Sequence, residues 1–197
     1  MLDKIGIIIL AAGGSSRLGS SKQLLRDRNG ETLIRRICKL ALSAHCKNVF
    51  CILGANHEVI DSELQDLNVT IAINPAWATG LASSIKAGLE IFNQQHPALE
   101  AAIFLVCDQP FVTIELINEI IHQFSTSGKS IIASHYQGIA GTPALFDRSM
   151  LPALMNLEGD RGAGKVIKEQ MQNVALVQFQ EGAFDIDTLK DYELFVR

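Results

Sequence analysis

Short apolar runs alternate with amphipathic stretches through most of the chain. Within the apolar runs, Ile, Leu, Val and Ala follow one another without the regular polar positions of a half-exposed strand. Continuous runs of this kind predict strands covered on both faces, as in a mainly parallel sheet. The predicted strands are Ile5–Ala11, Val49–Leu53, Val69–Ile73, Ala101–Cys107, Ser130–Ser134 and Val174–Phe179.

Helical periodicity fills the segments between these strands. The predicted helices cover residues 32–45, 57–66, 81–94, 113–126, 148–156 and 162–171. Strand followed by helix, repeated, implies right-handed crossovers and a three-layer α/β/α, Rossmann-like fold with a mostly parallel sheet. The pattern loosens after about residue 135, where we expect a β-rich insert or cap. No linker or internal repeat is visible, so we expect one domain over residues 1–197.

Composition narrows the class of protein. Of 197 residues, 48% are hydrophobic and 19% are charged, which predicts a packed globule. A net charge of −4 argues against a general nucleic-acid binder, which needs a basic face. The charge is uneven, because residues 1–36 hold seven basic and three acidic side chains and residues 37–197 hold ten and eighteen. This asymmetry predicts a local anion site near the N-terminus.

The cysteines and the apolar runs bear on the compartment. Four cysteines occur without a C-x-x-C pair or a zinc-like spacing with histidine. We therefore expect reduced, buried thiols in a cytoplasmic protein. No stretch approaches the ~18 apolar residues of a membrane span, so we expect no membrane association.

Polar and glycine-rich segments follow three of the predicted strands. They cover residues 12–22, 74–84 and 107–110. In open α/β sheets, ligands bind beyond the carboxyl ends of the strands. We therefore expect the three segments to form one shared site.

The first of these segments has the composition of a phosphate-binding loop. It reads Leu10-Ala-Ala-Gly-Gly-Ser-Ser-Arg-Leu-Gly-Ser-Ser-Lys22. Glycines let the backbone turn tightly and present several N–H groups to one anion, and Arg17 and Lys22 add positive charge. A Walker loop would need Gly-Lys-Ser/Thr, and a dinucleotide fingerprint would need G-x-G-x-x-G; the loop has neither.

An ordered set of motifs resembles one enzyme family. The first loop is similar to the nucleotidyltransferase signature L-A-A-G-x-x-x-R-x-G-x-x-K. Further matches follow in order along nearly the whole chain: Asn74-Pro-x-Trp-x-x-Gly80-x-x-Ser-Ser84, Cys107-Asp-Gln-Pro110, Gly141-Thr-Pro-Ala-Leu-Phe146, Gly159-Asp-Arg-Gly-Ala163 and Asp185-Ile-Asp-Thr188. The set resembles the molybdenum-cofactor nucleotidyltransferases (MobA-like NTP transferases), especially their cytidylyltransferase branch. The resemblance implies the nucleotide-diphospho-sugar transferase-like variant of the α/β fold.

In such enzymes a phosphate of one substrate attacks the α-phosphorus of an NTP and expels pyrophosphate. The attacking group is already anionic, so catalysis consists of positioning and charge neutralisation, usually with a divalent metal. The resemblance implies catalytic roles for Arg17, Lys22 and Asp108, with Mg²⁺, or alternatively Mn²⁺, held by Asp108 and Asp185. Pattern alone does not separate Asp185 from Asp187, because alternation puts both on one side of an extended segment. Asp187 is also a candidate cap for a helix beginning near Thr188.

The resemblance also implies which residues bind each substrate. The nucleotide-binding candidates are Leu10, Ala11, Ala12, Gly13, Gly14, Arg17, Lys22, Asn74, Gly80, Ser83 and Ser84. The candidates for binding the acceptor, a molybdopterin-type phosphate, are Gln109, Gly141, Pro143, Gly159, Asp160, Arg161 and Asp187. The guanylyl branch typically reads L-A-G-G in the first loop, where this chain has Leu10-Ala-Ala-Gly13. CTP is therefore favoured over GTP as the NTP.

Several alternatives stay open from the sequence. They are GTP as the nucleotide, a sugar or isoprenoid-alcohol phosphate as the acceptor, and a non-catalytic nucleotide-binding cofactor chaperone. A molybdoenzyme receiving the product is a further expected partner. An NAD-dependent oxidoreductase is disfavoured by the missing dinucleotide fingerprint.

Overall fold

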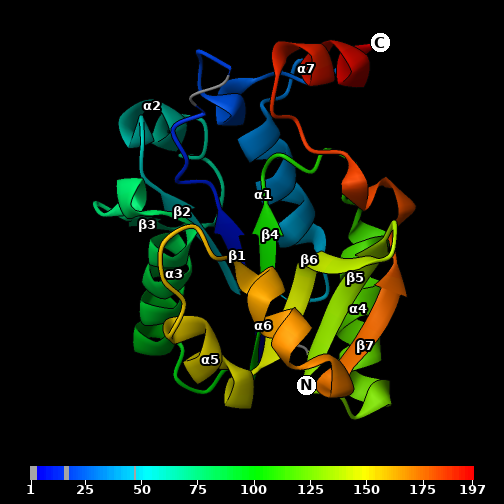
Figure 1. The fold of residues 1–197 in the computed structure, drawn as a ribbon. Coiled ribbons are helices and arrows are strands. Elements are labelled where there is room, and N and C mark those ends of the chain that lie inside the picture. Colours follow the sequence, from blue (N-terminus) through cyan, green and yellow to red (C-terminus); the bar gives the residue numbers. More distant parts are fainter. Residues whose placement is uncertain (1–3, 16–17, 47) are drawn as a thin grey trace.

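The computed structural model describes residues 4–15, 18–46 and 48–197. Its centre is one sheet of seven strands in the order β3-β2-β1-β4-β6-β5-β7 (Figure 1). The strands are β1 (Ile5–Leu10), β2 (Asn48–Leu53), β3 (Thr70–Ile73), β4 (Ala101–Val106), β5 (Ile131–Tyr136), β6 (Ile139–Asp147) and β7 (Val174–Gln178). The three-layer α/β fold expected from the sequence is confirmed.

Strands β1 and β4 form the middle of the sheet, and their sequences explain why. Every residue of β1 is buried, and β4 is buried up to Leu105. β1 runs parallel to β2 and to β4, with Ile8 opposite Phe50 on one side and Phe104 on the other. A strand covered on both faces requires a continuous apolar sequence. The carboxyl ends of β1 and β4 therefore emerge side by side from the centre of the molecule.

Strand β6 corrects the sequence-based strand list. The predicted β-rich insert is a strand of nine residues, placed between β4 and β5 and antiparallel to both. Its apolar run is interrupted where the register with β5 shifts. Ala133 pairs with Ala144, but Ser134 pairs with Gly141. Pro143 falls in the skipped stretch, where it need not donate a ladder hydrogen bond, and its carbonyl accepts one from the Ser134 hydroxyl at 2.7 Å.

The described part of the chain has seven α-helices, six of which cover the two faces of the sheet. They are α1 (Leu33–Ser43), α2 (His57–Ser62), α3 (Leu81–Gln95), α4 (Ile114–Ser127), α5 (Leu151–Met155), α6 (Ala163–Glu169) and α7 (Leu189–Val196). Helices α1, α2 and α4 pack into one apolar cluster, and α3, α5 and α6 into another on the opposite face. Figure 1 shows α6 in front of the sheet with α1 and α4 behind it.

The end of the chain forms a helix that is absent from the list of periodic segments, although a helix was expected to begin near Thr188. Helix α7 begins with a capping box, in which Thr188 and Asp191 satisfy each other's backbone N–H groups. In Figure 1, α7 lies above the carboxyl ends of β1 and β4. The helix cap is Thr188, so the alternative in which Asp187 caps this helix is wrong.

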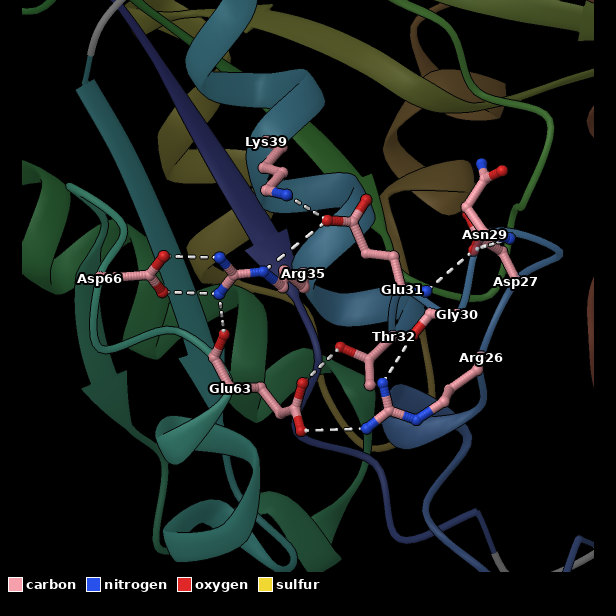
Figure 2. Close-up of polar contacts among 10 residues, drawn as sticks. All are labelled: Arg26, Asp27, Asn29, Gly30, Glu31, Thr32, Arg35, Lys39, Glu63 and Asp66. Carbon is pink, nitrogen blue, oxygen red and sulfur yellow. Dashed lines mark hydrogen bonds and ion pairs between the residues drawn. The ribbon is translucent and has the colours of Figure 1, made fainter.

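Two of the basic residues near the N-terminus, Arg26 and Arg35, form contacts within the protein. Figure 2 shows Arg35 of α1 in a two-pronged ion pair with Asp66, both contacts being 2.6 Å. Arg26 donates to the Gly30 carbonyl at 2.6 Å and lies 3.7 Å from Glu63. These contacts tie the turn before α1 to the end of α2. The positive charge of these arginines is thus largely neutralised within the protein.

The four cysteines are buried and free, as expected. Burial raises the pKa of the Cys46 thiol to about 12 and that of Cys107 further, so both thiols stay protonated. No helix in the described ranges is long and apolar enough to cross a membrane.

Candidate active site

A cavity of about 300 Å³ opens at the carboxyl ends of β1 and β4. Side chains and backbone from four separate segments line it. The lining residues are Leu10, Ala11, Ala12, Gly13, Lys22, Gln23, Trp77, Gly80, Leu81, Ser84, Val106, Cys107, Asp108 and Asp160. The three polar segments predicted to converge therefore do so, and the loop carrying Asp160 joins them.

The loop after β1 is shaped by a buried glutamine that sequence reasoning missed. Gln23 is 1% exposed, and its amide nitrogen donates to the carbonyls of Ala11 and Gly13 at 2.8 Å each. The backbone N–H of Lys22 donates to the Ser15 hydroxyl at 2.9 Å. The loop is thus folded back onto its own end, with Lys22 facing the cavity. Arg17, predicted to share this site, lies outside the described residues.

Lys22 lies between two carboxylates that are far away in the sequence. Its ammonium donates to Asp108 Oδ2 and to Asp187 Oδ1, each at 2.8 Å. Asp108 directly follows the end of β4, and Asp187 precedes α7. Partial burial opposes charging of the amine, but attraction and hydrogen bonds from both carboxylates outweigh it and raise the pKa of Lys22. Lys22 is therefore fully charged at neutral pH.

Asp185 lies near Tyr136 and Gln109. Partial burial and the nearby carboxylates of Asp108 and Asp187 raise the pKa of Asp185 to about 6. Partial burial and the charge of Asp185 likewise raise the pKa of Tyr136. Asp185 thus takes up a proton much more readily than an ordinary aspartate.

The segment after β3 is held by a ring of small polar groups. The buried Asn74 amide donates to the hydroxyls of Ser83 and Ser84, at 2.8 and 3.0 Å. Ser83 in turn donates to the carbonyl of Gly80 at 2.8 Å. These contacts fix the start of α3 at the wall of the cavity. Of the four predicted residues, Gly80 and Ser84 line the cavity, and Asn74 and Ser83 lie behind them.

Trp77 supports two glycine positions beside the cavity. A Cβ on Gly14 would lie 3.1 Å from the Trp77 ring, and one on Gly54 would lie 2.7 Å from the Trp77 Cβ. Glycine at both positions lets the indole pack directly on the backbone after β1 and β2. Trp77 therefore packs against the first loop at Gly14.

The predicted acceptor-binding residues separate into two groups. Gly159 and Asp160 lie against Gly80, and Asp160 lines the same cavity as the first loop. Gly141 lies instead beside Tyr136, whose hydroxyl would be 2.3 Å from a Cβ at that position. Gln109 is 3% exposed and donates to the Gly182 carbonyl at 3.0 Å.

The remaining two acceptor candidates, Pro143 and Arg161, lie outside the lining of this cavity. The Pro143 carbonyl is bound by Ser134, and Arg161 is exposed in the loop before α6. Tyr136 is a residue that sequence reasoning missed. Its only signal in the sequence is an aromatic at the end of a predicted strand.

The carboxylates offer a suitable donor set for a divalent cation. Asp108 and Asp187 already share one cation, the Lys22 ammonium, and hard oxygen ligands are what Mg²⁺ and Mn²⁺ prefer. In the described ranges no three His, Cys, Asp or Glu side chains are arranged to hold a metal ion. Two carboxylates suffice, however, where substrate phosphates supply the other oxygens.

Comparison with known sequences identifies the family. The MobA-like NTP transferase domain matches residues 7–174. The chain belongs to this family. The matched range contains the first loop, Asp108 and Asp160 but ends before Asp185 and Asp187. The contact of Asp187 with Lys22 comes from the structure. As a MobA-like NTP transferase, the chain is a nucleotidyltransferase.

Two curated relatives of this MobA-like NTP transferase match nearly its whole length. Molybdenum cofactor cytidylyltransferase from Escherichia coli (strain K12) is 28% identical over 97% of this chain and 95% of its own length. Nicotine blue oxidoreductase from Paenarthrobacter nicotinovorans is 25% identical over 93% of this chain and 92% of its own. The family therefore contains proteins of different names at similar distances.

Among solved structures, Rv0371c from Mycobacterium tuberculosis H37Rv has a TM-score of 0.82 to this fold. It is 25% identical, over 100% of this chain and 98% of its own. A manganese complex of Rv0371c has a TM-score of 0.78 at 24% identity, over 98% of both chains. The two similarities show a shared overall fold over nearly the whole chain.

Proposed function

We propose that this chain transfers a cytidylyl group from CTP to the terminal phosphate of a molybdopterin-type cofactor, releasing pyrophosphate. One observation carries the proposal: the charged Lys22 ammonium, held by Asp108 and Asp187, at the wall of a cavity formed by a glycine loop. The relative from Escherichia coli, a molybdenum cofactor cytidylyltransferase by name, supports the choice of both substrates.

The chain's own residues bind and orient the triphosphate in this proposal. Backbone N–H groups around Gly13 and Gly14 face the phosphates, as glycine-rich turns after a strand do. Lys22 neutralises charge that builds up on the phosphates as the bond to the leaving pyrophosphate lengthens. Arg17 is proposed to add a second cation. The attacking phosphate is already anionic, so no general base is needed.

A divalent cation fits the same place. Asp108 would hold it together with Asp185 or Asp187, and the ion would supply charge neutralisation and alignment of the phosphate oxygens. The convergence of Asp108 and Asp187 on one ammonium favours Asp187 as the second ligand. We propose Mg²⁺ as the ion, and the manganese complex of Rv0371c is a reason to test Mn²⁺ beside it.

The nucleoside and the acceptor are proposed to occupy opposite sides of this centre. Gly80, Ser83, Ser84 and Asn74 form the wall next to the nucleoside. The acceptor is proposed to bind toward Gln109 and Tyr136.

Three other proposals complete this description. Gly141, Pro143 and Arg161 are further acceptor contacts. The chain works as one domain in the cytoplasm, which agrees with its free, buried thiols. A molybdoenzyme then receives the product.

The proposal is tested by measuring pyrophosphate release for each NTP against each acceptor. CTP, GTP, ATP and UTP are combined with molybdopterin-type cofactor, a sugar phosphate, an isoprenoid-alcohol phosphate and no acceptor, each with Mg²⁺ or Mn²⁺. We expect release only with the molybdopterin-type acceptor, and fastest with CTP. Release with a different acceptor would overturn the acceptor assignment. Tight NTP binding without release anywhere would favour a non-catalytic cofactor chaperone.

A second candidate follows from the other curated relative. Nicotine blue oxidoreductase is an oxidoreductase by name, and it covers nearly the whole of this chain. A separate equilibrium titration with NADH tests whether this chain binds a reduced nicotinamide. Because the first loop has no G-x-G-x-x-G fingerprint, we expect no NADH binding.

A further inference from the structure

The loop before α6 is part of the wall of the nucleotide cavity. The Gly159 carbonyl accepts a hydrogen bond from the Ala82 N–H, at 3.0 Å, in the first turn of α3. A Cβ on Gly80 would lie 2.4 Å from the Gly159 carbonyl and 2.7 Å from Asp160 Oδ1. The two backbones therefore touch, and the Asp160 carboxylate rests directly against the Cα of Gly80.

Local geometry makes this contact specific. Gly80 has φ +112° and Gly159 has φ +60°, conformations that side chains with a Cβ disfavour. A Cβ on Gly162 would meet the Leu81 side chain at 2.8 Å, so the loop continues to follow the start of α3. Asp160 is therefore placed by packing over several residues and not by its own side-chain contacts.

The Asp160 carboxylate is exposed at the wall of the cavity. No hydrogen bond or salt bridge of this side chain occurs with any residue that the structure describes. Lys22, the cation of the cavity, is bound to Asp108 and Asp187, and no described salt bridge joins it to Asp160. The cavity thus has one wall where an ammonium lies between two carboxylates, and another with an exposed carboxylate that no described residue pairs.

This distribution of charge orients a nucleotide. With the proposed divalent ion on Asp108 and Asp187, the Lys22 wall would be net positive and attract a triphosphate, whereas the Asp160 wall would repel it, so the phosphates belong at the Lys22 wall. The neutral nucleoside then lies at the wall of Gly80, Leu81 and Asp160. A carboxylate accepts hydrogen bonds and donates none when ionised, so it selects ligand groups that donate.

We infer that Asp160 is a specificity-determining residue that accepts a hydrogen bond from the nucleoside of the bound NTP. The donor is an exocyclic amino group of the base or a ribose hydroxyl. This inference rests on the proposed function, in that the cavity takes an NTP. It moves Asp160 from the acceptor side, where the motif resemblance had put it, to the nucleoside side.

The test is the equilibrium binding of nucleotides, measured by calorimetry in the presence of Mg²⁺ and without any acceptor. Asp160→Asn keeps the size of the side chain and removes its charge. We expect it to weaken CTP binding by about tenfold to a hundredfold, as expected for loss of a charge-assisted hydrogen bond. The matched control is Glu158→Gln, which removes a charge from the same exposed loop at a residue that does not line the cavity.

Two further arms identify the donor. If the base amino group is read, the wild-type protein prefers CTP over UTP and Asp160→Asn loses that preference. If a ribose hydroxyl is read, 2′-deoxy- or 3′-deoxy-CTP binds as weakly to the wild-type protein as CTP does to the variant. In that case Asp160→Asn weakens the deoxynucleotide no further.

Some results would overturn the inference. CTP binding by Asp160→Asn equal to or tighter than that of the wild-type protein would do so. Asp160→Ser, tested in parallel with a thermal unfolding curve for each variant, separates a local effect from misfolding. Failure of the wild-type protein to bind any NTP would instead contradict the proposed function itself.

Discussion

At the scale of single residues, the site depends on how one lysine is shared. Lys22 is 16% exposed and contacts two carboxylates that come from positions 86 and 165 residues away. Without a ligand, the ammonium balances the charge that a divalent ion would balance in the loaded site. If the proposed metal ion binds Asp108 and Asp187, it competes with Lys22 for them, and the phosphates of an NTP relieve this competition by attracting Lys22.

The first prediction follows from this competition. Lys22→Met is expected to weaken NTP binding in the presence of Mg²⁺ by about tenfold to a hundredfold, through loss of a charge-assisted contact. The same variant is expected to bind Mn²⁺ alone more tightly than the wild-type protein, because the competing ammonium is gone. Calorimetry measures the NTP, and electron paramagnetic resonance of free Mn²⁺ measures the metal.

Lys39→Met is the control for this prediction. Lys39 is half exposed and pairs with Glu31 in the polar cluster of Figure 2, away from the cavity. The Lys39→Met variant is expected to leave the affinity for the NTP and the affinity for Mn²⁺ unchanged. Weaker binding of both the NTP and Mn²⁺ by Lys22→Met would contradict the competition.

The second prediction concerns Gln23. Gln23→Leu replaces the amide by an apolar side chain of similar size and leaves the carbonyls of Ala11 and Gly13 without their donor. Loss of partners for buried groups is expected to lower the free energy of unfolding by about 1–3 kcal/mol and to raise the KM for NTP. Urea unfolding and steady-state kinetics measure the two effects. A variant with normal stability and normal KM would show that Gln23 does not shape the loop.

At the scale of elements, one wall of the cavity depends on the contact between the start of α3 and the loop before α6. Gly80→Ala is expected to be strongly damaging, because a Cβ would lie 2.4 Å from the Gly159 backbone and φ is +112°. Both features oppose the substitution, so we expect a loss of more than about 2 kcal/mol of stability together with weaker NTP binding.

Gly164→Ala is the matched control for this third prediction. Gly164 lies in α6, and a Cβ there meets nothing within 4 Å. Alanine is the better helix former, so this variant is expected to be as stable as the wild-type protein or up to about 1 kcal/mol more stable. Thermal and urea unfolding compare the two. Equal effects of both substitutions would mean that the close contact at Gly80 is unimportant.

The fourth prediction concerns the ion pair between α1 and the turn after α2. The hydrogen bonds from Arg35 lower the pKa of Asp66 to about 2, below its usual value. A carboxyl with a lowered pKa stabilises the fold above its unfolded pKa, and that stabilisation is lost as the pH falls toward 2. Asp66→Asn is therefore expected to flatten the pH dependence of urea unfolding between about pH 4 and pH 2. An unchanged slope would contradict the pairing.

Elements with a strong local pattern could be predicted from the sequence, and those shaped by distant contacts could not. β1 and β4 are continuous apolar runs, so their burial on both faces followed directly, whereas their central position in the sheet comes from the structure. β6 was missed as a strand because Gly141 and Pro143 interrupt its apolar run at an irregular pairing with β5. Its identity depends on neighbours that the local pattern does not reveal.

The same difference applies to the candidate site. The convergence of the first loop, the Gly80 segment and Asp108 was predictable, since all three follow parallel strands. The pairing of Asp187 with Lys22 was not, because it requires the path of the chain after β7 to be known. The packing of Asp160 on Gly80 was likewise invisible, since it brings together two loops from different crossovers.

At the scale of the whole molecule, the charge asymmetry along the sequence resolves into two kinds of contact. Arg35 and Arg26 are paired within the polar cluster of Figure 2, so they contribute to the fold and not to an anion site. Lys22 faces the cavity from the centre of the sheet edge.

The mass of the product tests the central claim most directly. The wild-type protein and Lys22→Met are each incubated with CTP, Mg²⁺ and a molybdopterin-type cofactor, and the product is analysed by mass spectrometry. The account predicts an acceptor heavier by one CMP unit for the wild-type protein, with pyrophosphate in equal amount, and little product for the variant. An unmodified acceptor, or one heavier by a GMP unit, would contradict the account.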